Sequence, residues 1–244
     1  MSLADTPLPS VPRTIAGYDN TSRLTIESWP VTSPNGQPER CVTVSGTHPG
    51  IILALDRRDV NLAILHRDVP EDLTGPGLAP LLAAGPFIAT AKGKPSSIPI
   101  QLARRLPALA PAEFLQDIED LAAVFSMIDL WRGIVRVRLQ ALIHTDGASW
   151  RAGSFGLRML CTYRGPGTEW LSLPGGAAAT AKLSSDSPPP PTGQIPVGAV
   201  AVMKGEGHPD ARGAACIHRS PSGCSGIGAR LVLRIDQPDW NSDE

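Results

Sequence analysis

The chain has 244 residues, of which 42% are hydrophobic, and its formal net charge is −1. This length allows one large domain with a sizeable core, and the near-zero charge excludes a global field that attracts nucleic acid or anionic membranes. The longest apolar stretch, residues 78–91, is too short and too often broken by Gly and Pro to cross a bilayer.

Four scattered cysteines form no CxxC pair, and the N-terminal residues lack the pattern of a secretory signal. Free thiols are typical of a reducing compartment, so we expect a cytoplasmic protein.

Residues 1–38 are polar and punctuated by proline, which predicts a loosely packed arm. Residues 39–130 are expected to form a mixed, mainly helical support region, with small helices between residues 71 and 110. Short strands are expected before these helices, at residues 24–26, 41–44 and 51–55.

Residues 111–129 have the clearest helical pattern in the chain. Apolar side chains recur there at spacings of three and four, at Phe114, Ile118, Leu121, Phe125 and Ile128. Pro111 suits the first helical position, and Glu113 suits the positive end of the helix dipole. The apolar stripe predicts a helix packed against the core.

After this helix the hydrophobic period changes to two. Odd positions between 134 and 143 are apolar and even positions include Arg136, Arg138 and Gln140, which predicts a half-buried strand. Residues 174–193 are a low-complexity stretch, expected to be a surface loop or a lid. Further strands are expected at residues 157–163, 169–173, 197–204 and 229–236. This order predicts the α+β class, with an antiparallel sandwich or jelly roll in residues 131–244.

His144 and Asp146 follow the strand of residues 134–143 and project from one side, because alternate residues of a strand share a face. With His218 they form the ligand set of a facial triad, which holds Fe(II) and leaves coordination positions open. Thr-Asp-Gly is also a good turn sequence, so the pair could simply end the strand. Arg230, in a later strand, has the spacing for a counter-charge to a dicarboxylate co-substrate.

The order of these elements resembles the prolyl-hydroxylase-like branch of the Fe(II)/2-oxoglutarate oxygenases over residues 134–236. The strings VNLAILHRDVP, LRMLCTYRGPGTEWL, VMKGE and HRSP are similar to a bacterial family known only as a domain of unknown function, family eighteen twenty-six. The resemblance implies a double-stranded β-helix with helical elements packed on it. It also implies a metal held by His144, Asp146 and His218, and it does not identify a substrate.

Further polar residues are candidates for this site. Thr162 and Tyr163 could donate hydrogen bonds to a bound acid, with Arg230 as its cofactor-binding partner, or could simply pack. Arg158 or Arg234 could hold another acidic group, or be surface cations. Glu169 could orient Arg164 as an ion pair or contact the substrate, and Arg219, beside His218, is a further candidate near the substrate.

The leading hypothesis is a cytoplasmic Fe(II)- and 2-oxoglutarate-dependent oxygenase that acts on a small molecule or a peptide. One alternative is a non-catalytic protein of metal homeostasis that binds Zn(II) with the same residues. Another is a metal-free, cupin-like module that binds an acidic small molecule. The sequence indicates neither a nucleic-acid partner nor an oligomeric state.

Overall fold

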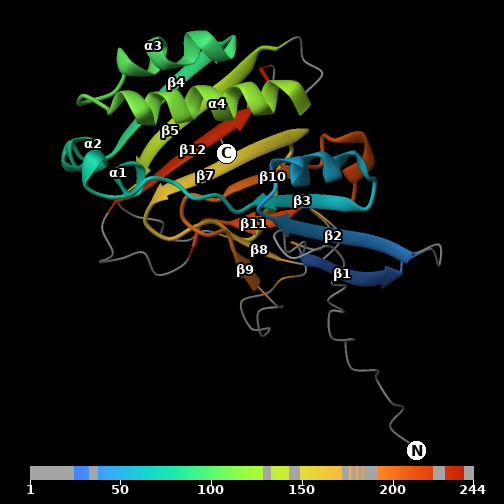
Figure 1. The fold of residues 1–244 in the computed structure, drawn as a ribbon. Coiled ribbons are helices and arrows are strands. Elements are labelled where there is room, and N and C mark those ends of the chain that lie inside the picture. Colours follow the sequence, from blue (N-terminus) through green and yellow to red (C-terminus); the bar gives the residue numbers. More distant parts are fainter. Residues whose placement is uncertain are drawn as a thin grey trace, which may run out of the picture.

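The computed structural model describes residues 25–32, 38–128, 133–142, 149–171, 192–221 and 229–238, and three single residues between 171 and 192. These residues form one large sheet, one small sheet and a layer of helices (Figure 1). The large sheet lies between the helices α3 and α4 and the small sheet. The chain is therefore of the α+β class, as predicted.

The large sheet has eight described strands, and its order brings together segments that are far apart in the sequence. All its neighbouring pairs are antiparallel except β2 with β3, which is parallel. From edge to edge the strands are β1 (Thr25–Thr32), β2 (Pro38–Gly46), β3 (Val60–Leu65), β10 (Val200–Lys204), β7 (Leu157–Arg164), β12 (Arg230–Asp236), β5 (Val135–Leu142) and β4 (Phe87–Gly93).

The small sheet has four described strands, all short and antiparallel. In order they are β6 (Arg151–Ala152), β11 (Ile217–Arg219), β8 (Glu169–Leu171) and β9 (Thr192–Gln194). From β5 onward the chain passes back and forth between the two sheets, with β5, β7, β10 and β12 in one and the intervening strands in the other. This alternation brings the polar residues of the second half of the chain between the sheets.

Helix α4 (Ala112–Ile128) confirms the helix predicted from the apolar stripe, of which Phe114, Ile118, Leu121 and Phe125 are buried. Figure 1 shows α4 with α3 over the outer face of the large sheet. The other helices are short: η1 (Pro49–Asp56), α1 (Glu71–Thr74), η2 (Pro76–Leu78), α2 (Ala79–Ala83), η3 (Pro95–Ser97), α3 (Ile98–Ala103) and η4 (Pro209–Ala211). No helix among the described residues has both the length and the apolar character needed to cross a membrane.

Side-chain alternation along the large sheet divides the interior into two cores. Odd-numbered residues of β5, β7 and β12, such as Val137, Cys161 and Leu233, pack with the helices. Even-numbered residues such as Leu160 and Val232 pack toward the small sheet in a second, smaller cluster. The period-two pattern therefore predicted correctly which residues of β5 and β12 face the helices.

Two expectations about the first half of the chain are wrong. Residues 51–55, expected as a strand, belong to the 3-10 helix η1, which begins at Pro49 and is capped by the His48 side chain. Residues 87–93, expected among small helices, form the edge strand β4, where the small side chains of Ala89 and Ala91 are the buried ones. Alanine contributes little to a hydrophobic pattern, so this strand has a weak signal.

Lys204, at the end of β10, is fully buried, and its Nζ donates to the Arg57 carbonyl at 2.9 Å. Most of residues 174–193 lie outside the described residues, so the loop stays a prediction. Thr192 and Gly193, at its end, belong to β9.

One polar network fixes α4 to the sheet. The Arg67 guanidinium contacts both oxygens of Asp117 on α4, with Nη2 2.9 Å from Oδ2, and its Nε donates to the Gly198 carbonyl at 2.9 Å. The Tyr163 hydroxyl donates to the same Asp117 carboxylate at 2.5 Å. Burial raises the pKa of Tyr163 well above its ordinary value, so the phenol stays protonated as a donor.

Asp117→Ala should lower the free energy of unfolding by about 3 kcal/mol, because it removes the carboxylate from a largely buried guanidinium and phenol. Asp120→Ala is the matched control, since Asp120 lies on the same helix and is exposed. It should change the free energy of unfolding by less than about 0.5 kcal/mol. Urea denaturation of both variants measures the difference, and equal losses would show that the network adds nothing.

Candidate functional site

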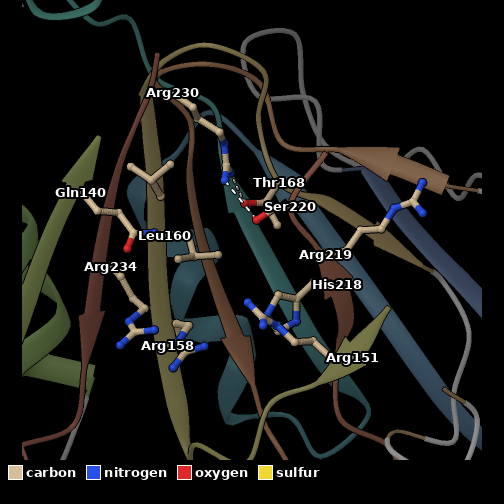
Figure 2. A pocket seen from close by; sticks show the side chains of 11 residues that line it. Gln140, Arg151, Arg158, Leu160, Thr168, His218, Arg219, Ser220, Arg230 and Arg234 are labelled. Atoms are coloured by element: carbon tan, nitrogen blue, oxygen red, sulfur yellow. Dashed lines mark hydrogen bonds between the residues drawn. The ribbon is translucent and has the colours of Figure 1, made fainter. Parts of the chain in front are cut away.

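A cavity lies between the two sheets, with an empty volume of about 410 Å³ that includes its open mouth. Figure 2 shows the side chains that surround it. They come from β5, β7 and β12 on one side and from β6 and β11 on the other, with Thr168 just before β8 and Ser220 just after β11. The described lining residues are Gln140, Arg151, Arg158, Leu160, Thr168, His218, Arg219, Ser220, Arg230, Val232 and Arg234. Five of these described residues are arginines, and three of the five, Arg158, Arg219 and Arg234, pair with Asp236 or Glu169.

Arg230 is held in place by a set of neutral oxygens. Its Nε donates to the Pro166 carbonyl at 2.8 Å, and its Nη2 donates to the Thr168 hydroxyl at 2.8 Å. Longer contacts of 3.4 and 3.5 Å reach the hydroxyls of Ser220 and Thr162. Because Arg230 is only 3% exposed, these contacts fix the direction of a buried cation that faces the cavity (Figure 2).

The glycine-rich turn between β7 and β8 explains how Pro166 and Thr168 reach Arg230. Gly165 has a φ of +79°, and a Cβ there would lie 3.1 Å from the Arg230 Cα. A Cβ on Gly167 would lie 1.7 Å from the Ile195 carbonyl oxygen. The string RGPGT therefore needs both glycines to bring its carbonyl and hydroxyl against the arginine.

A second group of cations lies further along the same strand. The Nε atoms of Arg158 and Arg234 contact the two oxygens of one carboxylate, Asp236, at 2.7 and 2.8 Å. Arg158 also stacks on the Phe155 ring, with its guanidinium carbon 3.9 Å from the ring centroid. Arg151, on β6, is paired directly with His218 in the small sheet.

His218 is 3% exposed and lies on β11, with its Nδ1 3.2 Å from the Cys216 carbonyl oxygen. Burial, together with the charges of Arg158 and Arg151, lowers the pKa of His218 to about 3, so the imidazole is neutral at physiological pH. A neutral ring whose Nδ1–H donates to a carbonyl keeps a lone pair on Nε2. That is the state in which histidine usually ligates a metal, so His218 fits the predicted role.

The other two predicted ligands, His144 and Asp146, lie outside the described residues. Within the described part of the chain, no three His, Cys, Asp or Glu side chains gather as a metal site would require. The triad therefore stays a prediction, of which the structure places one member in the cavity.

The structure brings some of the other predicted residues together and separates others. Arg158, Arg219, Arg230 and Arg234 all line the cavity, and Thr162 contacts Arg230. Tyr163 does not join them, because it is the next residue of the strand and so faces the helices.

Glu169 has a different partner from the one expected. Its carboxylate accepts from Arg219 Nε at 2.6 Å, while Arg164 reaches the Thr74 carbonyl instead. Glu169 and Arg219 are directly opposite each other on β8 and β11, which accounts for the pair.

Four polar lining residues were not singled out from the sequence: Gln140, Arg151, Thr168 and Ser220. Thr168 and Ser220 lie inside the quoted strings TYRGPGTEW and HRSP, and Gln140 lies on the polar face of the predicted strand. Arg151 belongs to a two-residue strand, which is too short for any periodic signal.

The metal-free protein should lose stability as the pH falls below the ordinary pKa of histidine, 6.5. Between pH 6.5 and about 3 the unfolded chain binds a proton at His218 that the folded chain does not, so the free energy of unfolding decreases with falling pH. From pH 7 to pH 5 this term amounts to about 2 kcal/mol.

His218→Asn removes the titrating group. Denaturant titrations at pH 7 and pH 5 should therefore show a smaller loss for His218→Asn than for the unsubstituted protein, by about 2 kcal/mol. The same loss in both proteins would mean that His218 titrates normally in the folded state.

Comparison with known proteins identifies a family for this chain. A family model described as "Protein of unknown function (DUF1826)" matches residues 46–236, which is most of the chain. No curated protein matches the sequence.

Several solved structures are similar to this chain at low identity. They include the dioxygenase for auxin oxidation of rice (14% identity, TM-score 0.39), covering 72% of this chain and 66% of that one. The Arabidopsis thaliana enzyme of the same name, solved with 2-oxoglutarate, is 13% identical with a TM-score of 0.38 and covers 65% of each chain. A full-length Neurospora crassa protein, solved in complex with alpha-KG, is 12% identical with a TM-score of 0.36 and covers 74% of this chain and 75% of that one.

This chain thus spans about two thirds of either auxin-oxidising enzyme.

Proposed function

We propose that this chain, which belongs to the family of unknown function matched by residues 46–236, is a non-haem Fe(II)- and 2-oxoglutarate-dependent oxygenase. One observation carries the proposal: a buried neutral histidine and a buried, clamped arginine face the same cavity from opposite sheets. An oxygenase of this class needs both, one for the metal and one for the far carboxylate of the keto acid.

The strand order supports a double-stranded β-helix as the scaffold. The strands from β5 to β12 alternate between two facing sheets, and only β8 and β9 are consecutive neighbours in one sheet. Two sheets linked in this way are typical of a jelly roll, in which side chains point inward from both walls. Residues placed far apart in the sequence, such as Arg158, His218 and Arg230, can then surround one small space.

His218 would hold the metal together with His144 and Asp146, the two ligands predicted from the sequence. Bound Fe(II) would supply the activation of O₂ and the oxidative decarboxylation of the keto acid. The protein's own contribution at His218 is to keep the imidazole neutral and oriented, through burial and the Cys216 carbonyl.

Arg230 would bind the distal carboxylate of 2-oxoglutarate. Its guanidinium is already oriented by Pro166 and Thr168, so little side-chain entropy remains to be lost when the acid binds. The hydroxyls of Thr168 and Ser220 accept hydrogen bonds from Arg230, and each hydroxyl hydrogen remains able to donate to a carboxylate oxygen. The result is a charge-assisted site flanked by two small donors.

Arg230→Ala should weaken 2-oxoglutarate binding roughly 30-fold or more, since removing one partner of a desolvated charge pair costs about 2–5 kcal/mol. Metal binding should remain intact. Arg234→Ala is the matched control on the same strand and should have a smaller effect. Anaerobic calorimetric titration of Fe(II), and then of 2-oxoglutarate, measures both steps, with thermal unfolding as a check on folding. Equal, small effects of the two substitutions would exclude 2-oxoglutarate as the co-substrate.

His218→Ala should abolish Fe(II) binding while Arg230→Ala does not. Anaerobic metal analysis after gel filtration compares the two variants with the unsubstituted protein. Retention of stoichiometric metal by His218→Ala would overturn the metal assignment. Binding of Zn(II) without any affinity for 2-oxoglutarate would favour a zinc protein of metal homeostasis. Keto-acid binding that survives chelation would favour a metal-free acid-binding module.

A further inference from the structure

Phe155 lies beside His218 but does not line the cavity. It follows β6 in the chain, and its side chain is only 1% exposed. The centroid of its ring is 5.9 Å from that of the His218 imidazole, and the two ring planes are inclined at 56°. The described residues that line the cavity do not include it. Phe155 therefore influences the cavity only through its neighbours, of which His218 is one.

Two glycines and an arginine enclose the Phe155 ring. A Cβ on Gly153 would lie 2.5 Å from Cδ1, at one edge of the ring, and a Cβ on Gly205 would lie 2.7 Å from Cδ2, at the other edge. The guanidinium carbon of Arg158 lies 3.9 Å from the ring centroid. With neighbours this close, the ring has little room to turn or shift.

The backbone around Phe155 is fixed as well. Carbonyl groups of residues 153–156 accept three hydrogen bonds from the backbone N–H groups of residues 205–207, at 2.8 to 3.0 Å. These bonds join the segment before β7 to the turn after β10. Phe155 is thus a rigid side chain on a rigid backbone, which is what a side chain needs if it is to hold a neighbour in place.

The His218 imidazole requires such a neighbour if it is to ligate a metal. Its one hydrogen bond to a described residue joins Nδ1 to the Cys216 carbonyl oxygen at 3.2 Å. The second side-chain torsion of histidine, which sets the ring plane, has only broad minima, so one hydrogen bond does not define that plane. A ligating side chain has to be held within about 10–20° of the productive geometry. Packing against Phe155 supplies this missing restraint.

We propose that Phe155 is a positioning residue of the proposed metal site, and that its ring sets the plane of the His218 imidazole. With the plane set, the Nδ1–H stays on the Cys216 carbonyl and Nε2 is the atom presented for ligation. The role in metal binding rests on the proposed function. The orientation of the imidazole does not, because the contacts that set it need no metal.

Nitrogen NMR of metal-free protein labelled at histidine reports the tautomer of His218 at neutral pH, with His218→Asn to assign its signals. The unsubstituted protein should show one tautomer, with the proton on Nδ1. In Phe155→Leu the imidazole can turn, so its two nitrogen signals should move toward each other as the second tautomer becomes populated.

Phe114→Leu is the matched control for this measurement. It makes the same substitution at a fully buried phenylalanine, which packs against Tyr163 in the core on the helix side of the large sheet. Apolar contacts are lost in both variants, but only Phe155 contacts the imidazole. Phe114→Leu should therefore leave both nitrogen signals of His218 unchanged.

The same variants test metal binding with Co(II), whose visible absorption bands report the geometry of its ligands. Phe155→Leu should weaken Co(II) binding at least tenfold and change the bands of the saturated protein, since groups that orient a metal ligand typically contribute about 10- to 100-fold in affinity. Phe114→Leu should keep its affinity within threefold and the same bands. If Phe155→Leu does not fold, Phe155→Met retains similar bulk without a rigid ring and should give both changes.

The inference is overturned if the unsubstituted protein already populates both tautomers, or if the Phe155 variants leave the single tautomer unchanged. An equal loss of Co(II) affinity in Phe114→Leu also overturns it, because the loss then reflects general packing. If the unsubstituted protein binds neither Co(II) nor Fe(II), the proposed function fails, and a change of tautomer in Phe155→Leu still supports the orienting contact. If the protein binds metal and Phe155→Leu changes neither readout, this inference fails alone.

Discussion

The strict alternation of side chains along β5, β7 and β12 is the constraint on which the molecule depends. These strands lie between the helices on one face and the small sheet on the other, and apolar residues of both faces are buried in two separate clusters. Cys161 and Leu233 complete the core beneath α4, while Leu160, Arg230 and Arg234 face the cavity. A shift of register by one residue would exchange the two sets and place arginines under the helix.

Several arginine side chains of this protein are buried or largely buried. Guanidinium groups are tolerated inside a protein only where oxygen acceptors are already in position. Arg67 binds both oxygens of Asp117 on α4, and Arg158 shares the Asp236 carboxylate of the neighbouring strand with Arg234. Arg230 instead donates to the Pro166 carbonyl and the Thr168 hydroxyl of a turn. The Asp117 carboxylate neutralises the cation and stabilises the fold. The acceptors described for Arg230 are neutral oxygens, which fix the direction of the guanidinium.

Much of this could be predicted from the sequence where a pattern is long enough. The stripe of α4 and the alternation of β5 and β12 follow from periodicity, and the alternation alone places Arg230 and Arg234 on one face. The same rule could have excluded Tyr163 from the cavity, because it adjoins Thr162. Strands of two or three residues, such as β6 and β11, have no readable period, so the position of Arg151 required the tertiary structure. His144 and Asp146 stay predictions of the sequence.

The position of β12 in the large sheet determines when the sheet can be completed during synthesis. β12 is the last described strand in the sequence, yet it lies between β5 and β7, and no sheet joins these two until it is inserted. Pairings across such sequence separations form slowly. During synthesis on the ribosome, the sheet would stay divided, with open strand edges, until residues 230–236 emerged. The nascent chain would then be a natural client for chaperones that shield exposed edges.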